Sequence, residues 1–208
     1  MSKVENLSNQ TYQFKQRTRS LFKFQEAYEV TNPETKEKLF FGKRDRLWLK
    51  RDLRVFQGID DKGPEYLFLK DNSIFDKFGS FTAMAPDGQV MGLVRRKFWR
   101  SFFLRETYEF ESPEGELVGK AQADGSIFKT WFRKLRILRI IPFIGPILAM
   151  LMRLQLEYID INGNQFATFK RKVSLRDFYK LVMADGDLPI PQGILIGMSM
   201  LFDSAEGR

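Results

Sequence analysis

Residues 81–96, FTAMAPDGQVMGLVRR, and residues 108–122, YEFESPEGELVGKAQ, follow the same pattern. Each begins with an aromatic residue, reaches a proline five positions later, continues with an acidic residue and a glycine, and places a second glycine six positions after the proline. Aromatic or β-branched runs on both sides of a turn made of Pro, Asp or Glu and Gly are typical of a β-hairpin. The two segments therefore predict two copies of one hairpin.

Three further segments resemble this unit, and they differ from it mainly in their turn residues. They are residues 28–43, which turn at Pro33, residues 55–70, which turn at Gly63, and residues 158–172, which turn at Gly163. The five units recur at intervals of about 26 residues, apart from a copy that is missing near residue 134. Short strands at regular spacing favour a sandwich or a barrel, so we expect a mainly β fold.

The amino-acid composition limits the kinds of chemistry that the protein can perform. The chain has 208 residues, of which 43% are hydrophobic, and this is enough for one domain with a sizeable core. It contains no Cys and no His. Disulfides and thiolate catalysis are therefore excluded, and the commonest general base and a usual zinc ligand are missing. We expect no enzyme activity, no catalytic residue, no metal site and no cofactor.

Two short motifs are weak matches to catalytic patterns. Residues 115–120, GELVGK, are one residue short of the phosphate-binding loop and lack its Ser or Thr, so we interpret them as part of a hairpin. Gly197-Met198-Ser199 matches only the start of a nucleophile elbow, and no His exists to activate the serine. We interpret this triplet as part of a core helix.

The net charge of the chain indicates which kinds of partner it can bind. The net charge is +8 and the pI is near 9.6, values that suit anionic lipid surfaces, nucleic acid or acidic proteins. The first residues, MSKVENLSNQ, are polar and lack the apolar run of a signal peptide. We therefore expect a cytoplasmic location, with peripheral association at the inner face of a membrane.

Residues 129–139, KTWFRKLRILR, combine basic and aromatic residues without any acid. Phe128, Trp131, Phe132, Leu135 and Leu138 recur at the spacing of one helical face, and the basic residues fall largely on the other side. A basic amphipathic helix with Trp and Phe on its apolar face is suited to the headgroup layer of a bilayer. Residues 95–105, RRKFWRSFFLR, form a second basic and aromatic cluster.

The uncharged run 140–152 follows directly, and it is shorter than the ~20 residues of a transmembrane helix. Pro142, Gly145 and Pro146 interrupt it and favour a turn between two short apolar arms. Residues 128–153 are therefore predicted to be a helical hairpin that inserts into the surface of a bilayer. The candidate insertion residues are Phe128, Trp131, Phe132, Leu135, Ile140, Ile141, Phe143 and Ile144; the candidate headgroup-binding residues are Arg95, Arg96, Lys97, Arg100, Arg133, Lys134, Arg136 and Arg139.

Other partners stay open at this point. The run 140–152 can instead pack on the barrel, dock on a partner such as a membrane protein, or mediate self-association, and the oligomeric state is open. Basic patches with interleaved aromatics also suit single-stranded nucleic acid through stacking and phosphate contacts. Nucleic-acid binding leaves the uncharged run without a role, so anionic membrane lipids are the preferred partner.

Residues 188–202, LPIPQGILIGMSMLF, break the β pattern because they carry no charge and are apolar on every side. A helix that is apolar all round is buried, and this one is short for a membrane span. We expect it inside the barrel.

The segments PDGQVMGLVRRKF and SPEGELVGK, followed by an apolar C-terminal helix that ends in Asp203, resemble the phospholipid scramblase and LURP-one-related branch of the tubby C-terminal-like superfamily. The resemblance implies a closed antiparallel barrel of twelve strands around a central helix, association with lipid headgroups, and movement of phospholipid between leaflets. On this basis residues 1–20 are a polar tail and residues 21–208 are the barrel domain, with an insertion at 128–153 and the central helix at 188–203. Residues 176–189 lack the closely spaced acidic ligands of a calcium loop, so calcium-triggered scrambling does not follow from the resemblance and the calcium dependence stays open.

Overall fold

The computed structural model describes residues 11–16, 25–45, 52–72, 79–96, 107–123, 155–171, 178–184 and 186–205. Within these ranges lie twelve β-strands and one α-helix. The elements are β1 (Thr11–Gln16), β2 (Gln25–Thr31), β3 (Lys38–Asp45), β4 (Leu53–Gln57), β5 (Glu65–Asp71), β6 (Ser80–Met84), β7 (Val90–Arg96), β8 (Thr107–Glu111), β9 (Leu117–Ala123), β10 (Gln155–Asp160), β11 (Gln165–Arg171), β12 (Phe178–Met183) and α4 (Gln192–Ala205).

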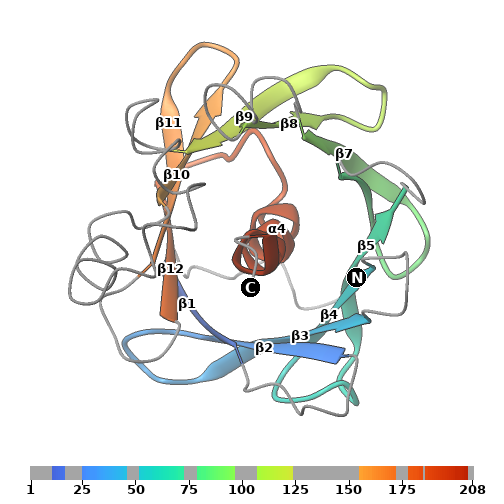
Figure 1. Cartoon of the computed structure of the whole chain (residues 1–208), viewed down its shortest axis with the longest axis vertical. Helices are drawn as coiled ribbons and strands as arrows, with labels where there is room; N and C mark the ends of the chain where they lie inside the picture. Colours follow the sequence, from blue (N-terminus) through green and yellow to red (C-terminus); the bar gives the residue numbers. More distant parts are fainter. Residues whose placement is uncertain are drawn as a thin grey trace, which may run out of the picture.

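The twelve strands form a closed antiparallel barrel around α4 (Figure 1). Each strand pairs with the strands before and after it in the sequence, and β1 pairs with β12 to close the ring. Closure is continuous, since five residues of β1 are matched in register to β12. The predicted mainly β fold, the closed barrel and the helix at its centre are therefore confirmed.

All five predicted hairpins are present, and the repeated glycines have two separate roles. Gly88 and Gly115 end the turns at φ values of +86° and +89°, a conformation that side chains rarely adopt. Gly92 and Gly119 lie on the strands. A Cβ at Gly92 would come within 2.7 Å of the Glu111 carbonyl oxygen and 3.4 Å of Ile194, and one at Gly119 within 3.0 Å of the Ile159 carbonyl oxygen and 3.3 Å of Ile190. The repeat therefore encodes a tight turn and a strand position that the backbone of the neighbouring strand, and behind it the C-terminal segment, approaches closely.

The barrel closes without a sixth repeat unit. The strands on either side of the missing copy, β9 and β10, pair directly with each other, and Ala123 faces Leu156 in their register. Residues 124–154 therefore connect two neighbouring strands.

The domain boundary expected after residue 20 is wrong. Thr11–Gln16, assigned to the polar tail, forms β1 and closes the barrel. Tyr12 and Phe14 point inward and are fully buried, while Gln13 and Lys15 alternate with them. Burial of two aromatic side chains and pairing on both edges hold this short segment in the fold.

The helix α4 begins four residues later than expected. Pro189 and Pro191 keep the chain out of the helical conformation, and the Pro191 carbonyl accepts hydrogen bonds from the N–H groups of Ile194 and Leu195. From Gly193 to Phe202 every residue of the helix is buried.

The fit between α4 and the barrel depends on small residues and aromatic rings. Gly42 on β3 makes room for the Met200 side chain. The ring of Phe202 lies 4.5 Å from that of Tyr108 and 6.3 Å from that of Phe169, measured between centroids. The helix is therefore the centre of the hydrophobic core.

Gly197→Val tests how closely α4 approaches the barrel wall. A Cβ at residue 197 would lie 2.8 Å from side-chain carbons of both Leu67 and Leu69. We expect the free energy of unfolding to fall by about 1–3 kcal/mol, the usual cost of overpacking, even though valine has a slightly better helix propensity than glycine. Urea unfolding followed by circular dichroism measures the change.

Ala184→Val is the control, because it adds volume at an exposed position after β12 and is expected to change stability by less than about 0.5 kcal/mol. Equal stability of the two variants would contradict the close packing of α4.

Candidate functional site

The barrel has two unlike ends. Because the strands alternate in direction, the tight turns 32–37, 58–64, 85–89, 112–116 and 161–164 all lie at one end, which we call the turn end. The β12–α4 linker leaves from the same end. The strand ends that flank residues 17–24, 46–51, 73–78, 97–106, 124–154 and 172–177 all lie at the other end, which we call the connection end.

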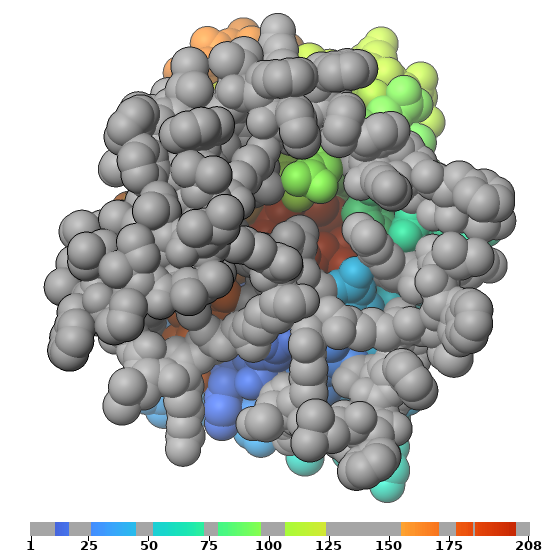
Figure 2. All heavy atoms as spheres, in the orientation of Figure 1, coloured from blue at the N-terminus to red at the C-terminus, as the bar shows by residue number. Residues whose placement is uncertain are grey.

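The helix runs from the turn end toward the connection end. Near its start, the Gln192 side chain donates a 2.7 Å hydrogen bond to the hydroxyl of Tyr12, at the turn-end part of β1. Near its other end, Phe202 packs on Tyr108 and Phe169, which lie at the connection-end parts of β8 and β11. In the space-filling view, atoms of α4 are visible at the centre with atoms of the strands around them (Figure 2).

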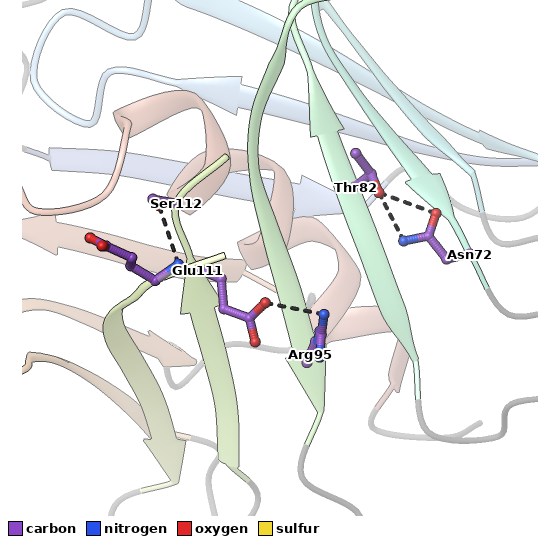
Figure 3. A network of polar contacts seen from close by, with 6 residues as sticks. Asn72, Thr82, Arg95, Glu111 and Ser112 are labelled. Carbon is purple, nitrogen blue, oxygen red and sulfur yellow. Dashed lines mark hydrogen bonds and ion pairs between the residues drawn. The ribbon is translucent and has the colours of Figure 1, made fainter. Parts of the chain in front are cut away.

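Two of the candidate headgroup-binding residues lie in the described part of the chain, at the connection end of β7. Arg95 points outward, its side chain is 56% exposed, and its guanidinium lies 3.3 Å from the carboxylate of Glu111 on β8 (Figure 3). Arg96 lies on the opposite face of the strand and its guanidinium stacks over the ring of Tyr108 at 5.8 Å. The structure therefore separates the two neighbours, and of this pair only Arg95 faces outward.

The other candidates lie outside the described residues. These are Lys97, Arg100, Arg133, Lys134, Arg136 and Arg139 of the headgroup set, and all of the insertion set, namely Phe128, Trp131, Phe132, Leu135, Ile140, Ile141, Phe143 and Ile144. The predicted helical hairpin 128–153 lies there as well. What the described strands establish is that this segment leaves β9 and enters β10 at adjacent positions of the connection end.

A buried ion pair lies inside the barrel near the connection end, and the sequence analysis missed it. The guanidinium of Arg44 on β3 lies 3.2 Å from the carboxylate of Glu26 on β2, and both side chains are at least nine-tenths buried. The hydroxyl of Tyr28 donates a 3.4 Å hydrogen bond to the same carboxylate. Glu26 alternates in phase with Tyr28 and Val30, which face the core. This strand phase is the signal that could have placed Glu26 inward.

The buried hydroxyls of the core make a structural contact. Ser199 on α4 donates a 2.8 Å hydrogen bond to the Leu195 carbonyl, and its oxygen lies 3.3 Å from the hydroxyl of Tyr158 on β10. Burial raises the pKa of Tyr158 well above its ordinary value, so the phenol stays protonated. The interpretation of Gly197-Met198-Ser199 as core helix is confirmed, and residues 115–120 are confirmed as part of the β8–β9 hairpin.

In the described ranges, no three His, Cys, Asp or Glu side chains lie together in a way that could hold a metal ion. None of the described helical residues belongs to a helix long and apolar enough to cross a bilayer.

Comparison with known proteins identifies no relative: no protein-family model, no curated protein and no solved structure matches this chain.

The buried ion pair can be tested by a double-mutant cycle with Glu26→Gln and Arg44→Met. Removing one partner leaves the other charge buried, so each single change is expected to lower the free energy of unfolding by about 3–5 kcal/mol. The double variant is expected to lose less than the sum of the single losses, because it leaves no unpaired charge. Urea unfolding of the wild type, the two single variants and the double variant gives the coupling free energy between Glu26 and Arg44.

Lys43→Met and Asp61→Asn provide the matched control. Their ion pair has a similar length of 2.9 Å, but the side chains are 32% and 42% exposed, so each change is expected to cost less than about 1 kcal/mol. Equal costs for the buried and exposed pairs would contradict the account.

Proposed function

We propose that this protein is a non-enzymatic, peripheral membrane protein that binds anionic phospholipids and belongs to the phospholipid scramblase and LURP-one-related type. In this proposal residues 128–153 form a basic amphipathic hairpin that enters the headgroup layer. Arg95, which faces outward, supplies a second basic patch together with Lys97 and Arg100, while Arg96 faces the other side of β7 and is not part of it. The protein acts on the cytoplasmic face of a membrane.

One observation supports the proposal most strongly. The basic, aromatic segment 129–139 is followed directly by the uncharged run 140–152, and the interior of the barrel is already filled. The interior is occupied by α4, which is buried from Gly193 to Phe202. A second apolar segment is therefore not needed to complete this core. An uncharged run that follows five basic residues in 129–139 is instead suited to the boundary between headgroups and acyl chains.

The expected energies are sufficient for membrane binding. Each Lys or Arg near an anionic surface contributes about 1 kcal/mol, so five contribute on the order of 5 kcal/mol. Insertion of Ile140, Ile141, Phe143 and Ile144 adds a comparable amount through burial of apolar surface. Micromolar affinity corresponds to about 8 kcal/mol.

The architecture supports the family proposal. A closed barrel of twelve antiparallel strands around a C-terminal helix is the fold that the resemblance of residues 86–98 and 112–120 implies. Movement of phospholipid between leaflets is the activity that the same resemblance implies. A fluorescent-lipid flip assay in vesicles reconstituted with the protein measures it directly.

Co-sedimentation with vesicles tests lipid binding. The wild-type chain is expected to sediment with vesicles that contain phosphatidylserine. A variant with Trp131→Ala, Ile141→Asp and Phe143→Asp is expected to bind at least tenfold more weakly, since it loses apolar insertion and adds charge.

Equal binding by the wild type and the variant would show that residues 128–153 do not contact the lipid. Tighter binding to a single-stranded oligonucleotide than to the vesicles at the same salt concentration would favour nucleic acid as the partner.

A pair of matched charge variants tests the headgroup patch. Arg95→Gln is expected to weaken binding to anionic vesicles about fivefold at low salt, the equivalent of about 1 kcal/mol for one cation near the surface. Lys62→Gln removes the same charge from an exposed turn at the other end of the barrel and is expected to leave binding unchanged. Equal weakening by both variants would show that net charge, and not the Arg95 position, governs binding.

A further inference from the structure

We infer that the barrel stands upright on an anionic bilayer, with the connection end facing the lipid and the turn end facing water. This inference rests on the proposed lipid binding and adds the orientation of the whole domain to it. It is based on the difference between the two ends of the barrel in the charged and aromatic residues of the segments that join the strands.

The turn end is acidic. In the described residues of its five tight turns and of 186–191, eight acidic residues stand against two lysines, and no aromatic residue is present. Most of the acidic side chains are exposed, among them Glu34, Asp87 and Glu114. An anionic surface repels this end.

Two carboxylates of these turns, and Asp160 directly before the β10–β11 turn, have pKa values below their ordinary range. A hydrogen bond from Lys43 lowers the pKa of Asp61, a hydrogen bond from Ser112 lowers that of Glu114, and hydrogen bonds from Asn164 lower that of Asp160. Because the charged form of each of these three groups is favoured, the three stay ionised in mildly acidic solution.

The sequences that join the strands at the connection end have the opposite character. Together they contain eighteen lysines and arginines against four acidic residues. They also contain all three tryptophans of the chain, Trp48, Trp99 and Trp131. Basic residues are attracted to anionic headgroups, and tryptophan prefers the boundary between headgroups and acyl chains.

The two ends are far enough apart to act as separate surfaces. The seven residues of β5 rise about 3.3 Å each, so the ends lie on the order of 20 Å apart. Charges in water are screened over about 8 Å at physiological ionic strength. The upright orientation therefore turns the connection end toward the bilayer and holds the acidic turn end away from it. The C-terminal half of α4 then points toward the membrane.

Single cysteines can report this orientation because the natural chain has none. Asn72→Cys places a label beside β5 at the connection end, and Asn162→Cys places one in the β10–β11 turn at the turn end. Both positions are exposed and both changes replace asparagine, and Asn72→Cys also removes the 2.8 Å hydrogen bond that the Asn72 amide donates to the Thr82 hydroxyl (Figure 3). Each is labelled with an environment-sensitive fluorophore and mixed with phosphatidylserine vesicles that carry a nitroxide quencher on the lipid headgroup.

We expect the label at residue 72 to be quenched at least threefold more than the label at residue 162, with equal sedimentation of the two proteins. Equal quenching, stronger quenching at residue 162, or no quenching of either label in sedimented protein would overturn the upright orientation and leave lipid binding intact. Failure of the unlabelled wild type to sediment would instead overturn the proposed function itself.

Discussion

The structure depends on the burial of α4 inside a closed ring of strands. Twelve strands enclose more space than inward-facing side chains alone can fill, since about eight strands already give an interior that side chains just fill. The helix supplies the missing volume, and glycines such as Gly42 on the wall and Gly197 on the helix allow the close approach. The aromatic rings around Phe202 complete the core at the connection end.

Filling the interior with a helix shifts recognition to the surface, and the up-and-down topology then decides which surface is available. The five turns 32–37, 58–64, 85–89, 112–116 and 161–164 are at one end of the barrel, and the other strand-to-strand connections join strands at the opposite end. A chain with a net charge of +8 is consequently not uniformly basic, because its turns are acidic. The proposed upright orientation rests on this separation of charge.

The sequence predicts those parts of the fold that depend on local chemistry. The five hairpins could be recognised because Pro, an acidic residue and Gly specify the turn within a few residues. The central helix could be recognised because it has no polar side. The strand β1 was missed because its six residues lie between polar and basic segments, and its place is set by pairing with β12, far away in the sequence. The Glu26–Arg44 pair was missed because no local motif marks it and its inward position depends on the phase of two strands. Arg95 and Arg96 were predicted as one patch, although successive strand residues face opposite sides.

The helix α4 lies at the centre of the barrel, and we expect it to stay there in the presence of a bilayer. Hydrogen exchange of the α4 amides, measured by mass spectrometry with and without phosphatidylserine vesicles, tests this claim most directly. The account predicts that residues 196–202 exchange as slowly as the barrel strands and that vesicles leave their protection unchanged. Faster exchange in α4 than in the strands, or loss of its protection on vesicles, would contradict the account.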